Sequence, residues 1–210
     1  MDKGDVFVIS APSGSGKTTI CRELLRRVDG IELSVSYTTR PRKAGESEGK
    51  DYHFIDDGRF DIMISLREFL EYAPVFGSRY GTSREAVRSI VARGNDALLE
   101  IDVQGGRKVK EALPEAILVG VFPPDRRVLE QRLFGRGRDS RDEMQARLAA
   151  AAEEMRALLA YDYIVINDDL EKAVDGIACI VRSFRYKRDR VRGRAEQIIR
   201  GTGKGATWRE

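Results

Sequence analysis

A glycine-rich turn between a predicted strand and a predicted helix constrains this chain more than any other feature. The turn reads Ala11-Pro-Ser-Gly-Ser-Gly-Lys-Thr18; the apolar run Val6–Ile9 precedes it, and an amphipathic pattern over Thr18–Val28 follows it. Backbone N–H groups in such a turn point inward, and the helix N-terminus adds about half a positive charge. Gly14 and Gly16 let the backbone approach phosphate oxygens without a Cβ clash. The pattern predicts a phosphate-binding loop that takes a nucleoside triphosphate.

Each polar residue of this loop has an expected role. Lys17 is placed to reach the β- and γ-phosphates, the Thr18 hydroxyl to ligate Mg²⁺, and Thr19 to add a phosphate contact. The chain departs from the strict pattern only at Ala11, where glycine is usual. A structural turn that merely contains Gly-Lys-Thr is the alternative interpretation. The predicted ATP-binding residues of the loop are Ala11, Pro12, Ser13, Gly14, Ser15, Gly16, Lys17, Thr18 and Thr19.

Strand-like and helix-like segments alternate along the chain. Short apolar runs at Asp5–Ser10, Ala97–Asp102, Ile117–Phe122 and Tyr163–Ile166 are separated by segments with helical periodicity. That alternation favours an α/β fold with a parallel sheet covered on both faces. Residues 40–83 are short, aromatic and turn-rich, with no long helical period, and we interpret them as an insertion. A long helix is predicted over Ser140–Leu159, with Ser140 and Glu143 as a capping box.

Composition excludes several classes of protein. The chain has 210 residues, 41% hydrophobic and 34% charged, which suits one globular domain and not a disordered or collagen-like chain. The apolar runs are far shorter than a membrane span, and the N-terminus carries no secretory signal pattern. With two cysteines that form no CxxC pair and a single histidine, His53, neither a zinc site nor a Ser-His triad is credible. We expect a cytoplasmic protein without a membrane partner.

Charge is unevenly distributed along the chain. The formal net charge of the chain is +3. Residues 182–210 alone carry +7, so residues 1–181 carry −4 and are mildly acidic. This distribution argues against a nucleic-acid groove across the fold. The basic C-terminal segment, 188–210, is expected to be a helix end that frays into a solvated tail. Weak binding of a polyanion by this tail is the alternative.

An ordered series of short blocks follows the phosphate loop: Ser34–Arg40, Gly45-Glu46, Gly49, Asp51–Phe54, Phe69–Tyr72, Arg79–Ser83, Leu99–Gly105, Arg132–Gly137, Arg147-Leu148 and Val165–Leu170. The series resembles that of guanylate kinases over roughly residues 5–187. The resemblance implies ATP-dependent phosphorylation of GMP, and of dGMP, to the diphosphate with Mg²⁺. It also implies the P-loop nucleoside-monophosphate-kinase fold, with mobile acceptor and lid segments.

The resemblance divides the chain into a guanylate-kinase-like domain, 1–187, and the basic tail. Within that domain we expect the core to comprise 1–33, 84–134 and 151–187. The GMP-binding insert is expected over about 34–83, and the lid over about 135–150.

The resemblance also assigns the residues that read the base. Glu71 and Asp102 are expected near the N1–H and N2–H₂ donors of guanine, and the Ser36 and Thr82 hydroxyls near its O6 acceptor. A carboxylate only accepts hydrogen bonds, so it suits guanine, whereas adenine offers it a bare N1 lone pair. Buried polar groups left unpaired reject the wrong base by about 10⁴-fold in favourable cases.

The GMP phosphate is expected to lie against Arg40, Tyr52 and Tyr80. The family usually places a second arginine three positions after the first, where this chain has Lys43, with Arg42 just before it. Lysine cannot form the bidentate fork of arginine. We predict that Lys43 takes this role; a shifted loop that brings in Arg42 is the alternative.

Three arginines match lid positions of the family: Arg132, Arg136 and Arg147. They are expected to close onto the γ-phosphate, because phosphoryl transfer depends on positioning and charge neutralisation. Asn167 resembles the position that contacts the adenine region of ATP, although Asn-Asp-Asp is also a good helix cap. Arg138 and Arg141 lie in the same segment; for these two, a role in the lid and a place in a solvated basic loop are equal alternatives.

Two other functions remain as alternatives. A non-enzymatic guanylate-kinase-like module would bind acidic or phosphorylated peptides through the acceptor groove, but such modules usually have damaged phosphate loops. A P-loop kinase of another small acceptor is the second, and Lys43 is the feature that favours it.

Overall fold

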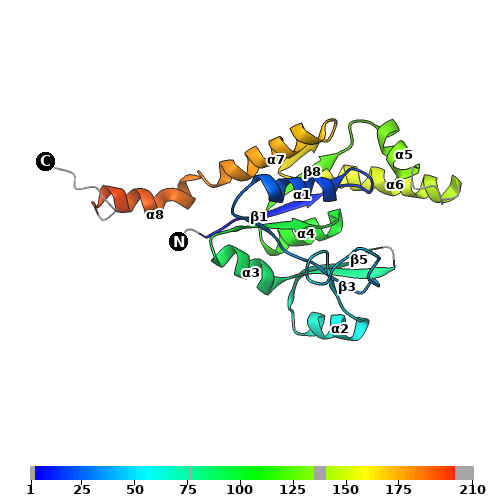
Figure 1. Ribbon diagram of the computed structural model, residues 1–210, viewed down its shortest axis with the longest axis horizontal. Coiled ribbons are helices and arrows are strands. Elements are labelled where there is room, and N and C mark those ends of the chain that lie inside the picture. The colour runs from blue at the N-terminus through cyan, green and yellow to red at the C-terminus, as the bar shows by residue number, and fades with distance from the viewer. Residues whose placement is uncertain (1–2, 76, 135–140, 202–210) are drawn as a thin grey trace.

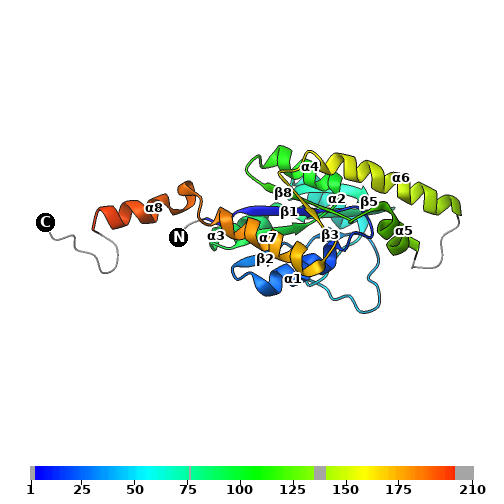
Figure 2. The ribbon, with the colours of Figure 1, turned by 90° about the horizontal axis from the view of Figure 1, so that it is seen from above.

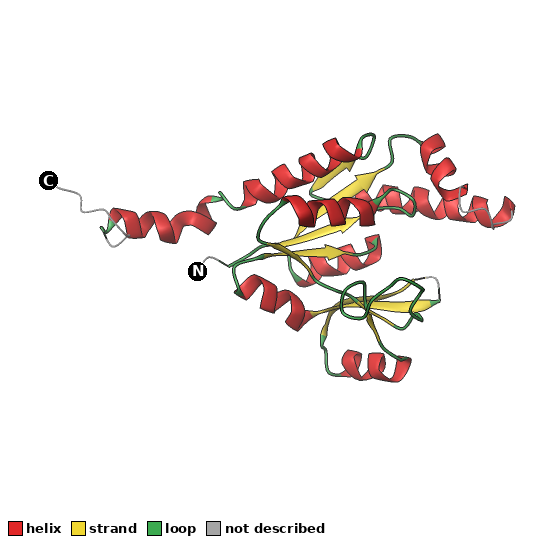
Figure 3. Cartoon of the chain, viewed as in Figure 1, coloured by secondary structure: helices red, strands yellow, loops and turns green. Residues whose placement is uncertain are grey.

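The computed structural model describes residues 3–75, 77–134 and 141–201, and the side chains of all of these except 134 and 141–144. A five-stranded parallel sheet forms the centre of the chain (Figures 1 and 3). This confirms the predicted α/β fold with a parallel sheet. In spatial order its strands are β2 (Ile31–Leu33), β7 (Asp96–Glu100), β1 (Val6–Ser10), β8 (Ile117–Phe122) and β9 (Tyr163–Ile166).

Helices cover both faces of this sheet because side chains of a strand alternate between faces. On one face, Phe7 and Ile9 of β1 pack with α1 (Lys17–Arg27) and α7 (Leu170–Phe184). On the other face, Val6 and Val8 pack with α3 (Arg84–Ala92), and α4 (Val103–Ala112) lies beside it. Figure 1 shows these two layers above and below the sheet.

A second, smaller sheet is built from residues between β2 and α3. Its order is β4 (His53–Phe54), β3 (Tyr37–Thr38), β6 (Ser78–Ser83) and β5 (Phe69–Val75). Helix α2 (Asp57–Ser65) packs on it through Phe60 and Met63. The sequence pattern missed this helix, since nine residues with two buried positions give too little periodicity; its clearest signal is Asp56, which caps it by accepting from Arg59 N–H at 2.7 Å.

Two helices extend beyond the central sheet on the side of the phosphate loop. They are α5 (Arg126–Phe134) and α6 (Arg141–Leu158), and they pack through Leu129, Leu133 and Ala151. Helix α6 matches the long helix predicted over Ser140–Leu159 within a residue at each end. The predicted capping box lies outside the described residues and side chains.

The C-terminal segment differs from the expected fraying tail. Residues Arg188–Ile199 form a separate helix, α8, which extends away from the core in Figures 1 and 2. Ion pairs between residues four apart support it, as between Arg192 and Glu196 at 2.8 Å. The buried Asp96 holds its start by accepting from Arg185 at 2.9 Å and from Arg190 at 2.8 Å. None of the helices formed by the described residues is long and apolar enough to cross a membrane.

Candidate active site

The phosphate loop lies at the carboxyl end of β1 and leads directly into α1. Gly14 and Gly16 have φ angles of 86° and 88°, a left-handed conformation that glycine adopts at little cost. Gly16 is also the N-cap of α1, so the first N–H groups of the helix face the loop. Among the described residues, the buried Ser15 hydroxyl has no hydrogen-bond partner. The left-handed glycines and the helix N-terminus are the features by which a loop directs backbone N–H groups at an anion.

Lys17 and Thr18 both reach the end of the neighbouring strand β7. Lys17 Nζ donates to the Ile101 carbonyl at 2.8 Å, and Thr18 Oγ1 donates to Glu100 Oε1 at 2.5 Å. Glu100 was not among the predicted site residues. An acidic side chain at the end of an otherwise apolar strand, Ala97–Ile101, is the signal that could have identified it. Carboxylate and hydroxyl oxygens are hard ligands of the kind that Mg²⁺ prefers, and these two lie side by side.

Asn167 supports the phosphate loop from below. Its Nδ2 donates to the Ser15 carbonyl at 2.8 Å, and the side chain is buried. A Cβ on Gly16 would lie 2.9 Å from that same amide nitrogen, so the two residues fit closely. The helix-capping role belongs to Asp169, which accepts from Lys172 N–H at 3.0 Å. The contact of Asn167 with adenine stays a prediction.

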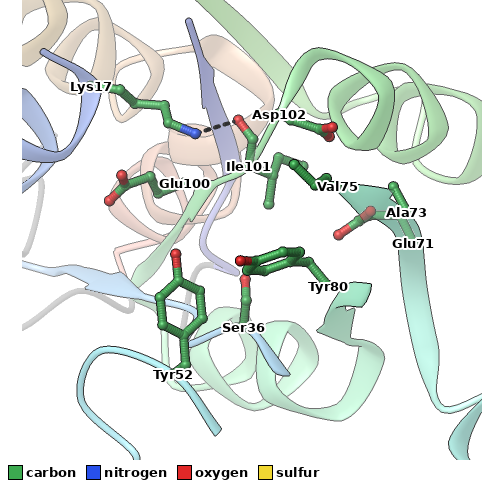
Figure 4. A pocket seen from close by; sticks show the side chains of 10 residues that line it. All are labelled: Lys17, Ser36, Tyr52, Glu71, Ala73, Val75, Tyr80, Glu100, Ile101 and Asp102. Carbon is green, nitrogen blue, oxygen red and sulfur yellow. Dashed lines mark hydrogen bonds between the residues drawn. The ribbon is translucent and has the colours of Figure 1, made fainter. Parts of the chain in front are cut away.

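A cavity of about 200 Å³ lies between the two sheets, beside Lys17. Five of the predicted GMP-binding residues line it: Ser36, Tyr52, Glu71, Tyr80 and Asp102. Figure 4 shows the Glu71 carboxylate and the Tyr52 and Tyr80 rings on the walls of this cavity, with Lys17 at its edge. Lys17 thus lies next to both the phosphate loop and this cavity, which we name the acceptor cavity after the predicted GMP-binding residues that line it.

Glu71 is buried in the wall of this cavity on β5. Its Oε1 accepts from the Thr82 hydroxyl at 2.6 Å, and Thr82 is itself fully buried. Burial is the main cause that raises the pKa of Glu71 to about 7, and the nearby Asp102 raises it further. The single hydrogen of the Thr82 hydroxyl is thus used in its bond to the Glu71 carboxylate. Its predicted contact with guanine O6 would require this bond to be exchanged.

Arg40 is fixed by two side chains of the insert. Its Nε donates to Tyr80 Oη at 3.3 Å, and its Nη2 donates to Glu46 Oε1 at 2.8 Å. The second oxygen of Glu46 accepts from Lys43 N–H at 2.8 Å, so this carboxylate also shapes the loop. The bond from Arg40 lowers the pKa of Glu46. Glu46, which was not predicted as a site residue, is therefore charged and holds Arg40 in place.

Tyr52 lies beside Arg40, whose guanidinium carbon is 5.4 Å from the centre of the tyrosine ring. Burial is the main cause that raises the pKa of Tyr52 to about 12, so its hydroxyl stays a donor at neutral pH. The Lys43 and Arg42 side chains are exposed on the loop, and neither lines the cavity.

The predicted lid arginines are only partly described. Arg132, on α5, lines a hollow with Gly16, Thr19 and Asn167, which brings it to the phosphate loop. Arg147 is half-buried on α6. Arg136 lies outside the described residues, as does Arg138, and the Arg141 side chain is not described.

Helix α6 contributes a carboxylate that the sequence did not indicate. Glu154 lies close enough to the Ser13 N–H of the phosphate loop, and to Lys17 and Asp102, for these groups to influence its ionisation. Burial is the main cause that raises its pKa. Nothing in an Ala- and Glu-rich helix distinguishes this residue from its solvated neighbour Glu153.

Comparison with known proteins agrees with this geometry. The sequence model of the guanylate kinase family matches residues 3–184. A guanylate kinase of Neisseria gonorrhoeae is 49% identical over 191 residues, covering 91% of this chain and 93% of that protein. One of Dechloromonas aromatica is 46% identical, covering 93% and 99%. The crystal structure of guanylate kinase from Anaplasma phagocytophilum aligns with a TM-score of 0.77 at 34% identity, covering 97% of this chain and 98% of that one. A phosphate loop joined to a carboxylate-lined acceptor cavity, on a chain with these relatives, places the protein in the guanylate kinase family.

Proposed function

We propose that this chain transfers the γ-phosphoryl group of ATP to GMP, and to dGMP, by in-line displacement. The observation that carries the proposal is the position of Lys17. Its ammonium group belongs to the phosphate loop and also lines the acceptor cavity that holds Glu71 and Asp102. Donor and acceptor phosphates bound at these two sites would therefore meet at one cation, as phosphoryl transfer requires.

Base recognition is assigned to the two carboxylates of the cavity. Glu71 comes from β5 and Asp102 from the end of β7, so the cavity brings acceptors together from both sheets. Guanine offers N–H donors on its N1 and N2 atoms, which match this pair. The Ser36 side chain, on the same cavity, supplies a hydroxyl for O6.

The phosphate of GMP is assigned to Arg40, Tyr52 and Tyr80. The Arg40 guanidinium has five N–H donors, and its bonds to Tyr80, the Pro41 carbonyl and Glu46 engage only part of them. The tyrosine hydroxyls add neutral donors beside it. Lys43 is assigned as an outer contact that neutralises charge when the loop approaches the cavity.

The donor side fits a magnesium nucleotide. Thr18 and Glu100 offer two hard oxygen ligands beside the phosphate loop, and Mg²⁺ in such sites takes its other ligands from phosphates and water. When bound, the ion would neutralise phosphate charge. Gly14–Thr19 would bind the phosphates through N–H groups, and Arg132, with Arg136 and Arg147, would cover the γ-phosphate and exclude water.

Mechanistically, the protein residues position groups and stabilise charge. The acceptor is a phosphate oxygen that is already ionised at neutral pH, so no general base is required. Lys17 would follow the transferring group from donor to acceptor.

We propose that the reaction takes place in the cytoplasm.

Two alternatives are disfavoured by specific observations. A peptide-binding module has no use for the Thr18–Glu100 pair or for an ordered phosphate loop. A kinase of an acceptor without N–H donors would leave the two carboxylates of the acceptor cavity without partners.

The proposal is tested by measuring ATP consumption with Mg²⁺ and, one at a time, GMP, dGMP, AMP, UMP and CMP. Turnover with GMP and dGMP alone is expected. Turnover with another nucleotide would contradict the base assignment, and no turnover with any of the five would contradict the kinase assignment.

A further inference from the structure

The first turn of α4 carries two adjacent glycines that make room for two different side chains. A Cβ on Gly105 would lie 2.9 Å from Glu71 Oε2 and 3.1 Å from Asp102 Oδ1. A Cβ on Gly106 would lie 2.0 Å from the hydroxyl oxygen of Tyr161. Tyr161 is therefore fitted against α4 at least as closely as the base-reading Glu71 is, although it lies outside the acceptor cavity.

The Tyr161 hydroxyl begins a directed chain of hydrogen bonds. It donates to Ser10 Oγ at 3.0 Å, and the Ser10 hydroxyl donates to the Asp102 carbonyl at 3.1 Å. A carbonyl only accepts and a serine hydroxyl has one hydrogen, so the direction of both bonds is fixed. Ser10 is fully buried, and burial raises the pKa of Tyr161 to about 12, which keeps the phenol a donor.

These bonds fix the backbone that carries Asp102. The Ile101 carbonyl accepts from Lys17, the Asp102 carbonyl accepts from Ser10, and Asp102 Oδ1 accepts from Gly105 N–H at 2.8 Å. The carboxylate can be in register with a base only while this backbone is held. Of these three contacts, the one through Ser10 continues to Tyr161, which lies outside the acceptor cavity.

Tyr161 also lies three residues after the C-terminal end of α6. Its N–H donates to the Leu158 carbonyl of α6 at 3.0 Å, one turn beyond Glu154, which lies near the phosphate loop. Helix α6 therefore brings Glu154 near the phosphate loop, and its C-terminal end is bonded to Tyr161, which is linked to Asp102 through Ser10.

We propose that Tyr161 is a positioning residue for guanine recognition, which acts through Ser10 to hold Asp102 and links α6 to the acceptor cavity. The inference rests on the proposed role of Asp102 at the base. Ordered relays of this kind polarise one another, so loss of the first bond weakens the second.

The test compares Tyr161→Phe with Tyr163→Phe in steady-state kinetics of the full chain. Tyr163 lies two residues away, is partly exposed and contacts Phe184 through its ring. We expect Tyr161→Phe to raise the KM for GMP about three- to tenfold, the range that loss of one neutral hydrogen bond gives, with the KM for ATP unchanged. Tyr163→Phe is expected to change neither. Equal changes in both KM values for Tyr161→Phe, or a lower Tm with unchanged KM values, would mean a structural role only.

A double-mutant cycle tests whether Tyr161 acts on Asp102 through Ser10. Ser10→Ala breaks the same relay one step later, so the Tyr161→Phe/Ser10→Ala double variant should have the KM for GMP of Ser10→Ala alone. Multiplying effects would overturn the route through Ser10. Asp102→Asn is measured in parallel: an unchanged KM for GMP there would refute the base assignment itself. A change there without one in Tyr161→Phe would refute only the positioning role.

Discussion

The Thr82 hydroxyl donates to the Glu71 carboxylate at 2.6 Å, and neither group is exposed to solvent. This bond stabilises the ionised form of Glu71, but burial outweighs it and leaves the pKa near 7. Glu71 therefore titrates in the physiological range, in the wall of the acceptor cavity.

The affinity for GMP should consequently depend on pH. Below pH 7 the protonated Glu71 loses its acceptor role toward the base, so the KM for GMP should rise about tenfold between pH 8 and pH 6. The phosphate of GMP itself titrates near pH 6. Glu71→Gln, which cannot titrate, is therefore the control: its profile should retain only the part due to GMP. Identical profiles for the two proteins would contradict the assignment.

Removal of the Lys17 ammonium should separate transfer from acceptor binding. Lys17→Ala is expected to lower kcat by about a hundredfold or more, because it removes the cation at the transferring group, while GMP binding measured by calorimetry stays nearly intact. Lys172→Ala, an exposed lysine on α7, is the matched control and should retain activity. Full activity of Lys17→Ala would refute the phosphate-loop assignment.

The Thr18–Glu100 pair should set the requirement for magnesium. Thr18→Ala and Glu100→Gln are each expected to raise the Mg²⁺ concentration for half-maximal rate about tenfold, since each removes or weakens an oxygen ligand. Glu85→Gln, exposed on α3, is the control. The measurement is a titration of the rate with Mg²⁺ at fixed nucleotide. Curves that coincide with that of the unmodified protein would remove these residues from the metal site.

Glu46 should matter for GMP and not for ATP. Glu46→Gln removes the charge that holds Arg40, and we expect the KM for GMP to rise about three- to tenfold. Glu48→Gln lies in the same loop but pairs with His53, so it should have little effect. An equal effect of both variants would indicate that the whole loop is disturbed.

Asp96 should be important for stability. Asp96→Asn leaves Arg185 and Arg190 facing a neutral group, and breaking such a buried pairing costs about 3 kcal/mol. Asp175→Asn, in an exposed pair with Arg27, should cost less than about 1 kcal/mol. Urea unfolding measures both. Similar losses for the two variants would show that the Asp96 cluster contributes no more than a surface ion pair.

The sequence was sufficient for the features that depend on local pattern. Alternating apolar runs predicted the parallel sheet, and five of the residues assigned to GMP by the family resemblance line the acceptor cavity. Glu100 and Glu154 were missed because their roles arise from tertiary contacts: each meets the phosphate loop across many intervening residues. Helix α8 was missed because it buries no apolar face, so periodicity carries no signal there.

The two ends of strand β7 carry residues with different roles, one in stability and the other at the cavity. Its first residue, Asp96, anchors the C-terminal helices, while its last, Glu100, and the following Asp102 line the acceptor cavity. Substitutions of Asp96 should lower the free energy of unfolding, whereas substitutions of Glu100 or Asp102 should alter substrate binding and the choice of nucleotide. A protein fused to the C-terminus should therefore leave catalysis unchanged as long as Arg185 and Arg190 keep their bonds to Asp96. Conversely, substitutions in the acceptor cavity should leave the attachment of the C-terminal helices intact.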